Sequence, residues 1–421
     1  MLLPASKFAP LPDSVAVIKG GVTSPRGFSA AGVSSGVKKR GRLDLGLLVS
    51  DLPSVSAAVF TRNAAAAAPV CVTRETSDCS HLRAVVVNSG NANACTGAQG
   101  RADAARMQAL TAWRLHLPAK QVAVASTGLI GVALPMDKIE IGIGAAAQTL
   151  KTSGSSPAAA AEFAAAVRTT DKFAKGGALE VELAGGVVHL GLAAKGCGMI
   201  SPNMATMLCF VTCDADVSAQ DWDRLLRAAV AKSFNRITVD GQESTNDMVL
   251  GLCNGASGVK PGEEGLVVLG EALDAALLAL ALSIVVDGEG TTHTMRLTVS
   301  GARDAGEAEA VARAVANSPL VKTAFYGRDA NWGRIAQAVG QAVGRAGRSL
   351  LPVEIAYEEL SLVRKGSAVA LDQAGCDRLK EIMGQPEIDL RIALGGSHGE
   401  ALVYFSDLSH DYVSLNAEYP T

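Results

Sequence analysis

Residues 195–208 read KGCGMISPNMATML, and this stretch is the most informative part of the chain. Its glycines and proline predict a loop, and the apolar residues after them predict a buried strand. Thr206 lies where the loop meets the strand, directly after Ala205. If the bond between these two residues breaks, the new α-amine, with a pKa of about 7.7–8.0, can take the Thr206 hydroxyl proton. Threonine activated by its own amine is a known nucleophile.

Taken alone, the same pattern also fits an ordinary strand over residues 206–213 with one hydrogen-bonded hydroxyl, because β-branched residues favour strands.

The composition indicates a globular chain of 421 residues, long enough for two lobes or domains. Hydrophobic residues make up 48% and charged residues 19%, which excludes a disordered chain. A net charge of −3 gives no reason to expect a nucleic-acid partner.

No uninterrupted apolar run reaches the roughly 18 residues of a membrane span, so no membrane partner is expected. The longest run covers residues 275–286, contains Ser283, and predicts a buried helix that passes into a strand. Residues 1–13 contain no long apolar segment, so no secretory signal is expected. We therefore expect a cytoplasmic protein, or one of the plastid stroma or mitochondrial matrix if a transit peptide has been removed.

The 8 cysteines form no CxxC pair, and the 6 histidines are not spaced as metal ligands. We expect reduced thiols and no metal site. No phosphate-binding glycine motif supports a nucleotide enzyme. Residues 32–36 satisfy the GxSxG pattern of a hydrolase elbow, but basic, turn-like residues follow instead of a helix, which disfavours an esterase.

Strands and helices alternate in both halves of the chain, which favours an α/β fold. In the first half we expect strands at residues 15–18, 57–60, 83–88 and 122–126, helices at 98–115 and 158–167, and a hairpin of 179–183 with 187–192. In the second half we expect a helix from Ser218, begun by a capping box with Asp221, to about residue 233. Further expected elements are strands at 295–299, 389–394 and 401–405 and helices at 305–316 and after Asn331.

Several motifs resemble, in the same order, those of the glutamate N-acetyltransferase (ornithine acetyltransferase) family of arginine biosynthesis. The loop at residues 195–208 resembles the family's self-processing site, with Cys197 in place of the usual serine. Other matching segments are PRGF (25–28), NSGNANA (88–94), STGLIG (126–131), TTD (169–171), STND (244–247), DANWGRI (329–335) and NAEYPT (416–421). One departure is the alanine run at residues 64–66, where the family often has bulkier or basic residues.

The resemblance implies a mixed αββα sandwich that cleaves itself between Ala205 and Thr206. The products would be an α chain of residues 1–205 and a β chain of residues 206–421, assembled as two of each. Acetyl would pass from N2-acetylornithine to Thr206 and then to glutamate by a ping-pong route, without a cofactor. Acetyl-CoA as a further donor stays open, because members that use it and members that do not share these motifs.

The resemblance also implies roles for particular residues. Thr127 and Gly128 would form the oxyanion hole, and a Gly128→Val variant is expected to fold but to lose most of its rate. Substrate would be bound by Thr206 and by Lys195, Thr169 or Thr170, Glu289, Asn416 and Thr421. The ordinary structural alternative is a glycine turn for Thr127 and Gly128, a solvated surface lysine for Lys195, and a threonine turn beside Asp171 for Thr169 or Thr170. It is a loop carboxylate for Glu289 and a frayed terminus for Asn416 and Thr421.

Two other functions stay in view. A self-processed amidohydrolase or aminopeptidase would use similar chemistry but pass the acyl group to water. An inert binding protein on the same scaffold is the second alternative. The joint presence of Thr206, Thr127 and Lys195 disfavours it, because an inert relative has no need of all three.

Overall fold

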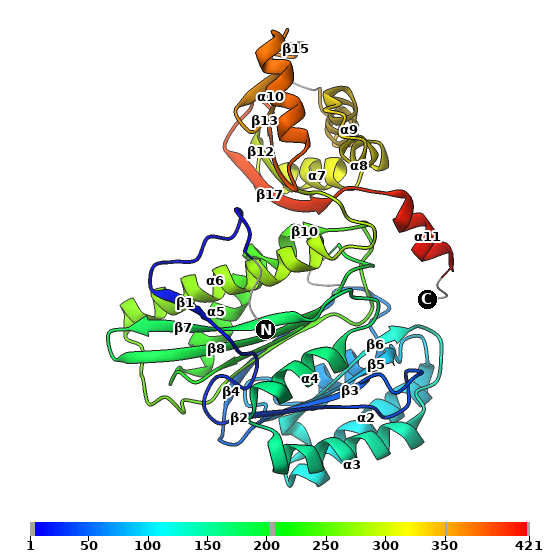
Figure 1. Ribbon diagram of the computed structural model, residues 1–421, viewed down its shortest axis with the longest axis vertical. Helices are drawn as coiled ribbons and strands as arrows, with labels where there is room; N and C mark the ends of the chain where they lie inside the picture. Colours follow the sequence, from blue (N-terminus) through cyan, green and yellow to red (C-terminus); the bar gives the residue numbers. More distant parts are fainter. Residues whose placement is uncertain (1–4, 202–206, 350–351, 419–421) are drawn as a thin grey trace. The chain divides into compact units, whose positions relative to one another are not determined.

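The computed structural model describes residues 5–201, 207–349 and 352–418 of the chain (Figure 1). The chain forms two compact units. The first is built within residues 1–235 and 242–284, and the second within residues 236–241 and 285–420. Both described flanks of the predicted cleavage junction belong to the first unit.

Two sheets form the centre of the first unit. The six-stranded sheet consists, in spatial order, of β1 (Val15–Ile18), β7 (Lys175–Leu183), β8 (Gly186–Lys195), β9 (Leu208–Cys213), β11 (Met248–Cys253) and β4 (Val55–Phe60). The four-stranded sheet consists of β2 (Phe28–Val33), β3 (Leu45–Ser50), β5 (Ala84–Asn91) and β6 (Val122–Leu129). β5 and β6 are parallel, whereas β2, β3 and β5 pair antiparallel.

Helices cover the outer faces of both sheets (Figure 1). The four-stranded sheet packs on α1 (Ala68–Thr76), α2 (Gly97–Leu115) and α3 (Met136–Ser153), and the short helix η1 (Ala119–Gln121) precedes β6. On the six-stranded sheet, the Trp222 indole of α5 (Ala219–Lys232) donates to the Gly251 carbonyl of β11, 3.0 Å away. α6 (Glu263–Val286) packs beside α5. The predicted αββα sandwich is therefore confirmed.

The core between the two sheets follows from strand alternation. Leu208 and Phe210 of β9 point inward, and every second residue of the four-stranded sheet, such as Val85 and Val87, joins the same cluster. α4 (Pro157–Val167) lies in this layer, where Phe163 meets Phe210 edge to face at 5.1 Å. A chain with only 4% aromatic residues thus fills its central layer mostly with alanine and aliphatic side chains.

The strands on either side of the predicted junction are neighbours in one sheet. β8 ends at Lys195 and β9 begins at Leu208, and the two strands pair antiparallel with Lys195 opposite Leu208. The hairpin of β7 and β8 and the strand after residue 206 are therefore confirmed. The pairing of β8 with β9 therefore fixes Lys195 and Leu208, the two ends of the segment that contains the predicted junction.

The apolar run at residues 275–286 is the main correction. It belongs entirely to α6, which continues to Val286, so no strand begins there. Hydropathy alone does not separate a buried strand from a buried helix. Among the described residues, α6 is also the one helix long and apolar enough to cross a membrane, and 67% of its apolar window is buried within the protein, as in the core helix of a globular protein.

The second unit has one seven-stranded sheet. Its strands, in spatial order, are β10 (Ile237–Thr238), β17 (Gly399–Ser406), β12 (Thr294–Ala302), β16 (Glu387–Ala393), β13 (Glu354–Tyr357), β14 (Leu360–Arg364) and β15 (Ser367–Ala368). Its helices are α7 (Ala305–Ala316), α8 (Pro319–Tyr326), α9 (Trp332–Arg345), α10 (Gln373–Met383) and α11 (His410–Glu418), and η2 (Phe234–Arg236) leads into β10. The expected strands at residues 295–299, 389–394 and 401–405 and the expected helices at 305–316 and after Asn331 are confirmed.

Close contact between α4 and β2 generates a test of the packing. A Cβ atom on Gly32 would lie 2.1 Å from the Glu162 carbonyl oxygen of α4. We expect Gly32→Ala to destabilise the protein by roughly 1–3 kcal/mol, because the helix must move away from the sheet. Gly144→Ala on α3 is the control, since its Cβ would meet nothing nearer than the flexible Arg114 guanidinium at 3.6 Å.

Thermal unfolding of the two variants beside the wild type measures the effect. Gly144→Ala should match or slightly exceed the wild-type melting temperature, because alanine favours helices. Equal melting temperatures for Gly32→Ala and Gly144→Ala would contradict the packing described here.

Candidate active site

Gly128 lies near the end of β6, where the parallel ladder places it opposite Gly90 of β5. Its φ angle is +135°, a backbone conformation that residues other than glycine rarely adopt. A Cβ atom there would lie 2.3 Å from the Gly90 carbonyl carbon. The expectation that Gly128→Val folds normally is therefore wrong, because valine would force the two strands apart. Glycine at this position lets the backbone of β5 approach the end of β6.

Thr127 and Lys195 meet in the structure. The Lys195 ammonium, on the last residue of β8, donates to the Thr127 hydroxyl at 3.2 Å. Because the hydroxyl oxygen accepts this bond, its own proton stays available for donation to a third group. That orientation suits a donor to a developing oxyanion. The sequence assigned Lys195 to a substrate carboxylate, whereas its observed contact is the neighbouring candidate residue.

A buried carboxylate organises the segment that carries the two candidate threonines. Asp171 accepts from the Lys175 ammonium and from the Gly196 backbone N–H, both at 2.7 Å, and from the Thr169 N–H at 2.9 Å. The side chains of Asp171 and Lys175 are fully buried. Burial alone would raise the pKa of Asp171, but the charges of Lys175 and Lys195 hold it well below its usual range. Asp171 is therefore a permanent anion that ties this segment to the loop after β8.

Asp171 and Lys175 were not predicted as site residues. Asp171 belongs to the TTD motif, and a lysine four residues later was the available signal. That spacing identifies a neighbouring pair only in a helix, whereas residues 168–174 form an irregular, bent segment here and Lys175 begins β7.

Thr169 and Thr170 are placed differently. The Thr170 hydroxyl lies 3.0 Å from the Cys197 sulfur in the glycine-rich loop. Thr169 is held through its backbone, because its carbonyl also accepts from Arg42 at 3.0 Å. Thr170 thus presents its side chain to the loop that follows Lys195.

Glu289 and Asn416 meet in the second unit. The Asn416 amide on α11 donates to the Glu289 carboxylate at 2.8 Å, although the residues are 127 positions apart in sequence. The structure therefore groups the described candidates into two sets, one in each unit. Ala205, Thr206 and Thr421 lie outside the described residues.

The GxSxG motif runs from the end of β2 into an irregular loop. Residues 34–44 connect β2 to β3 and contain no helix. The Ser35 hydroxyl and N–H both donate to the buried Asp44 carboxylate, at 2.8 and 2.6 Å. The motif lacks the strand-to-helix geometry of a nucleophile elbow, as expected.

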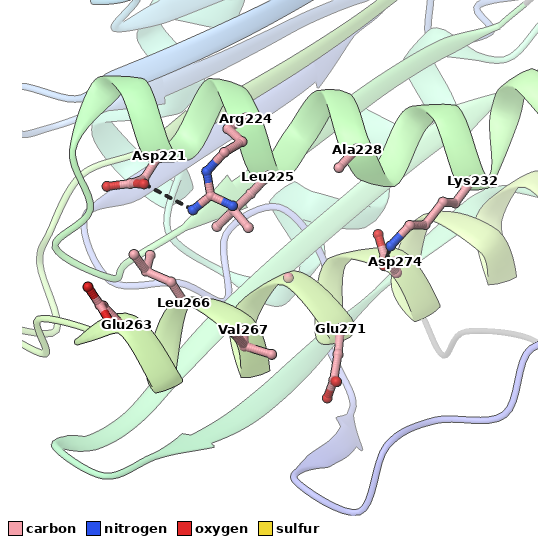
Figure 2. Close-up of a pocket in the computed structure, with 11 residues that line it drawn as sticks. Asp221, Arg224, Leu225, Ala228, Lys232, Glu263, Leu266, Val267, Glu271 and Asp274 are labelled. Atoms are coloured by element: carbon pink, nitrogen blue, oxygen red, sulfur yellow. Dashed lines mark hydrogen bonds and ion pairs between the residues drawn. The ribbon is translucent and has the colours of Figure 1, made fainter.

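A separate groove with a volume of about 510 Å³ lies between α5 and α6, on the outer helical layer (Figure 2). Figure 2 shows Arg224 directed at Asp221 and Lys232 at Asp274, so the basic groups that line the groove are paired with carboxylates. None of the described candidate residues lines it.

Cys197 offers a test of the loop's burial. Burial and the nearby Asp171 charge raise the pKa of the Cys197 thiol to about 12, so it stays protonated near neutral pH. Since thiolate is the reactive form, iodoacetamide at pH 8 should modify the exposed Cys95 and Cys376 but not Cys197. Peptide mass spectrometry measures the modification, and denatured protein, in which all three should react, is the control. Equal native rates at Cys197 and Cys95 would show that the loop is open.

Comparison with known proteins gives one consistent result. A profile of the ArgJ family matches residues 29–421. The arginine biosynthesis bifunctional protein ArgJ of Nitratidesulfovibrio vulgaris is 47% identical over 399 residues, which cover 94% of this chain and 99% of that protein. The chloroplastic ArgJ of Physcomitrium patens is 42% identical and aligns with 96% of this chain and 78% of that protein.

Solved structures include ornithine acetyltransferase complexed with ornithine from Mycobacterium tuberculosis. That protein is 41% identical to this chain. The structural match covers 45% of this chain and 100% of the solved one, with a TM-score of 0.41. The family match and the curated relatives span almost the whole sequence. The chain therefore belongs to the ArgJ family.

Proposed function

We propose that the protein is a glutamate N-acetyltransferase of arginine biosynthesis, which moves acetyl from N2-acetylornithine to glutamate. Membership of the ArgJ family supports an acyltransferase of this pathway. The structural observation that carries the proposal is the contact of Lys195 with Thr127, 68 residues apart in sequence, directly beside Gly128. A positioned hydroxyl next to a glycine backbone is what acyl transfer needs at its oxyanion.

In the proposed mechanism the Thr206 hydroxyl attacks the acetyl carbonyl of N2-acetylornithine, and its own α-amine takes the proton. The Thr127 hydroxyl and the Gly128 N–H stabilise the negative oxygen of the tetrahedral intermediate. The amide C–N bond then breaks, ornithine leaves with the proton, and acetyl remains as an ester on Thr206. Glutamate's amine attacks that ester and departs as N-acetylglutamate, which restores Thr206.

Maturation would precede this chemistry. The Thr206 hydroxyl attacks the Ala205 carbonyl, the peptide C–N bond breaks, and the Thr206 nitrogen takes the proton, which leaves a free α-amine and an ester. Water then hydrolyses this ester to give the Ala205 carboxylate and the Thr206 hydroxyl. The two products, residues 1–205 and 206–421, assemble as two copies of each. Acetyl-CoA is a further candidate donor, and no cofactor is required.

Substrate would be bound by Lys195, by Thr170 or Thr169, and by Glu289, Asn416 and Thr421. The placement of the described members supports the assignment. The Thr170 hydroxyl lies against Cys197 of the glycine-rich loop, and the Asn416 amide donates to the Glu289 carboxylate. We place the enzyme in the cytoplasm. The chloroplastic name of the Physcomitrium patens relative supports the plastid as the alternative.

Cleavage and transfer depend on the same residue in this proposal. Intact-mass spectra of wild-type protein should show two fragments, the second beginning at Thr206. Thr206→Ala should abolish cleavage and transfer, and Thr206→Ser should retain part of both, because hydroxyl and amine survive. Acetylglutamate formation is measured beside acetate release, since a hydrolase would yield acetate alone. Transfer by uncleaved Thr206→Ala would contradict the mechanism.

Thr127 allows a narrower test of the oxyanion hole. Thr127→Val removes the hydroxyl at nearly constant volume, and one oxyanion donor contributes about 3–4 kcal/mol, so kcat should fall about 10²–10³-fold. Thr127→Ser is the matched control and should keep most of the rate. Steady-state kinetics on fully cleaved protein measure both variants, and an unchanged kcat in Thr127→Val would remove Thr127 from the mechanism.

A further inference from the structure

Lys38 joins two segments that border the candidate site. Its ammonium donates to the Leu43 carbonyl at 3.0 Å and to the Arg168 carbonyl at 2.5 Å. Arg168 is the C-cap residue of α4, and carbonyls at a helix C-terminus have no partner within the helix. A cation at this position also interacts favourably with the helix dipole. Lys38 therefore fixes the point at which α4 ends and the segment of residues 168–171 begins.

The loop that carries Lys38 is itself held firmly. The fully buried Asp44 carboxylate accepts from the Lys38 backbone N–H at 2.8 Å, in addition to both Ser35 bonds. From the same loop, Arg42 donates to the Thr169 carbonyl. Two cations of one anchored loop thus hold two consecutive carbonyls of the segment that carries Thr170.

The stem of Lys38 also lies against β5, the strand that pairs with β6. A Cβ atom on Gly90 would lie 3.0 Å from the Lys38 Cγ atom, so the stem covers the backbone of Gly90. Gly90 is the ladder partner of Gly128. The Lys38 side chain therefore contacts both Gly90 and the segment of residues 168–171.

We propose that Lys38 is a positioning residue of the acetyl-transfer site, which holds the segment of residues 168–171 where a bound amino-acid substrate meets it. The inference rests on the proposed function. Among the described residues, the Lys38 ammonium bonds the carbonyls of Leu43 and Arg168 and neither Thr127 nor Gly128, and the β5–β6 ladder fixes Gly128 independently. Loss of Lys38 should therefore weaken substrate binding more than it slows the chemical step.

The charge of Lys38 is sensitive to alkaline pH. Burial and the neighbouring Arg42 lower its pKa to about 8, Lys195 acts in the same direction, and Asp44 and Asp171 oppose the shift. The ammonium is present below that pH and is lost above it. For N2-acetylornithine as donor, kcat/KM should therefore fall above about pH 8. The substrate's own side-chain amine titrates only near ~10.4, as in lysine, and deprotonation of the Thr206 amine acts in the opposite direction.

The experiment compares wild type, Lys38→Met, Lys38→Arg and Lys39→Met as fully cleaved proteins. Lys39 is the matched control, because it is the exposed neighbour and carries the same charge. We expect Lys38→Met to raise the KM for N2-acetylornithine at least tenfold with kcat changed less than threefold, and Lys39→Met to leave both unchanged. Lys38→Arg should restore KM and lose the alkaline fall in kcat/KM, because a guanidinium does not titrate there.

Equal KM values in Lys38→Met and Lys39→Met would overturn the role of Lys38, as would identical behaviour of Lys38→Met and Lys38→Arg. If Lys38→Met does not mature, the pH profile of Lys38→Arg decides, and an alkaline fall as in wild type would overturn the proposal. Absence of transfer in the wild type contradicts the proposed function itself and overturns this inference with it. Wild-type transfer with unaffected variants overturns only the inference.

Discussion

The buried ion pair between Asp171 and Lys175 is the interaction on which the candidate site depends. Two charges without access to water are tolerated only when they are paired and hydrogen-bonded. Here the same carboxylate also accepts the Gly196 N–H and the Thr169 N–H. Removal of one partner from such a pair typically costs about 3–5 kcal/mol, so the geometry is strongly enforced. Lys195, one residue before Gly196, is thereby held where its ammonium reaches Thr127.

Close backbone approach is the second constraint, and it follows from composition. With 44 glycines and few aromatic residues, the chain brings main chains together where other proteins insert side chains. Gly32 admits the backbone of α4 onto β2, and Gly128 admits the backbone of β5 onto β6. The first contact shapes the sandwich and the second shapes the candidate oxyanion site. Fold and chemistry thus rest on the same use of glycine.

Local patterns in the sequence predicted most elements, because each depends on residues close in the chain. The Ser218–Asp221 capping box is one case: the Ser218 side chain accepts from the Asp221 N–H at the start of α5. The end of α6 was missed, because an apolar run carries no period that separates strand from helix. The contacts of Lys195 with Thr127 and of Asn416 with Glu289 join distant residues, so the family resemblance named these residues but could not supply their partners. The contacts of Asp171, Lys175 and Lys38 were missed because they are tertiary and leave no local pattern in the sequence.

The strand order of the first unit explains how a chain cut at residue 205 could remain one protein. In the six-stranded sheet, β9 and β11 come from beyond the predicted junction, yet they lie between β8 and β4, which come from before it. Both outer ladders, β8 with β9 and β11 with β4, would therefore join the two products by backbone hydrogen bonds.

The core between the sheets is shared in the same way. Phe210, from beyond the junction, packs on Phe163, from before it. An α chain alone would have a sheet with its two inner strands missing, and its β8 and β4 would present unpaired edges. If the chain is cut at the predicted junction, the two ladders and the shared core would therefore hold the products together.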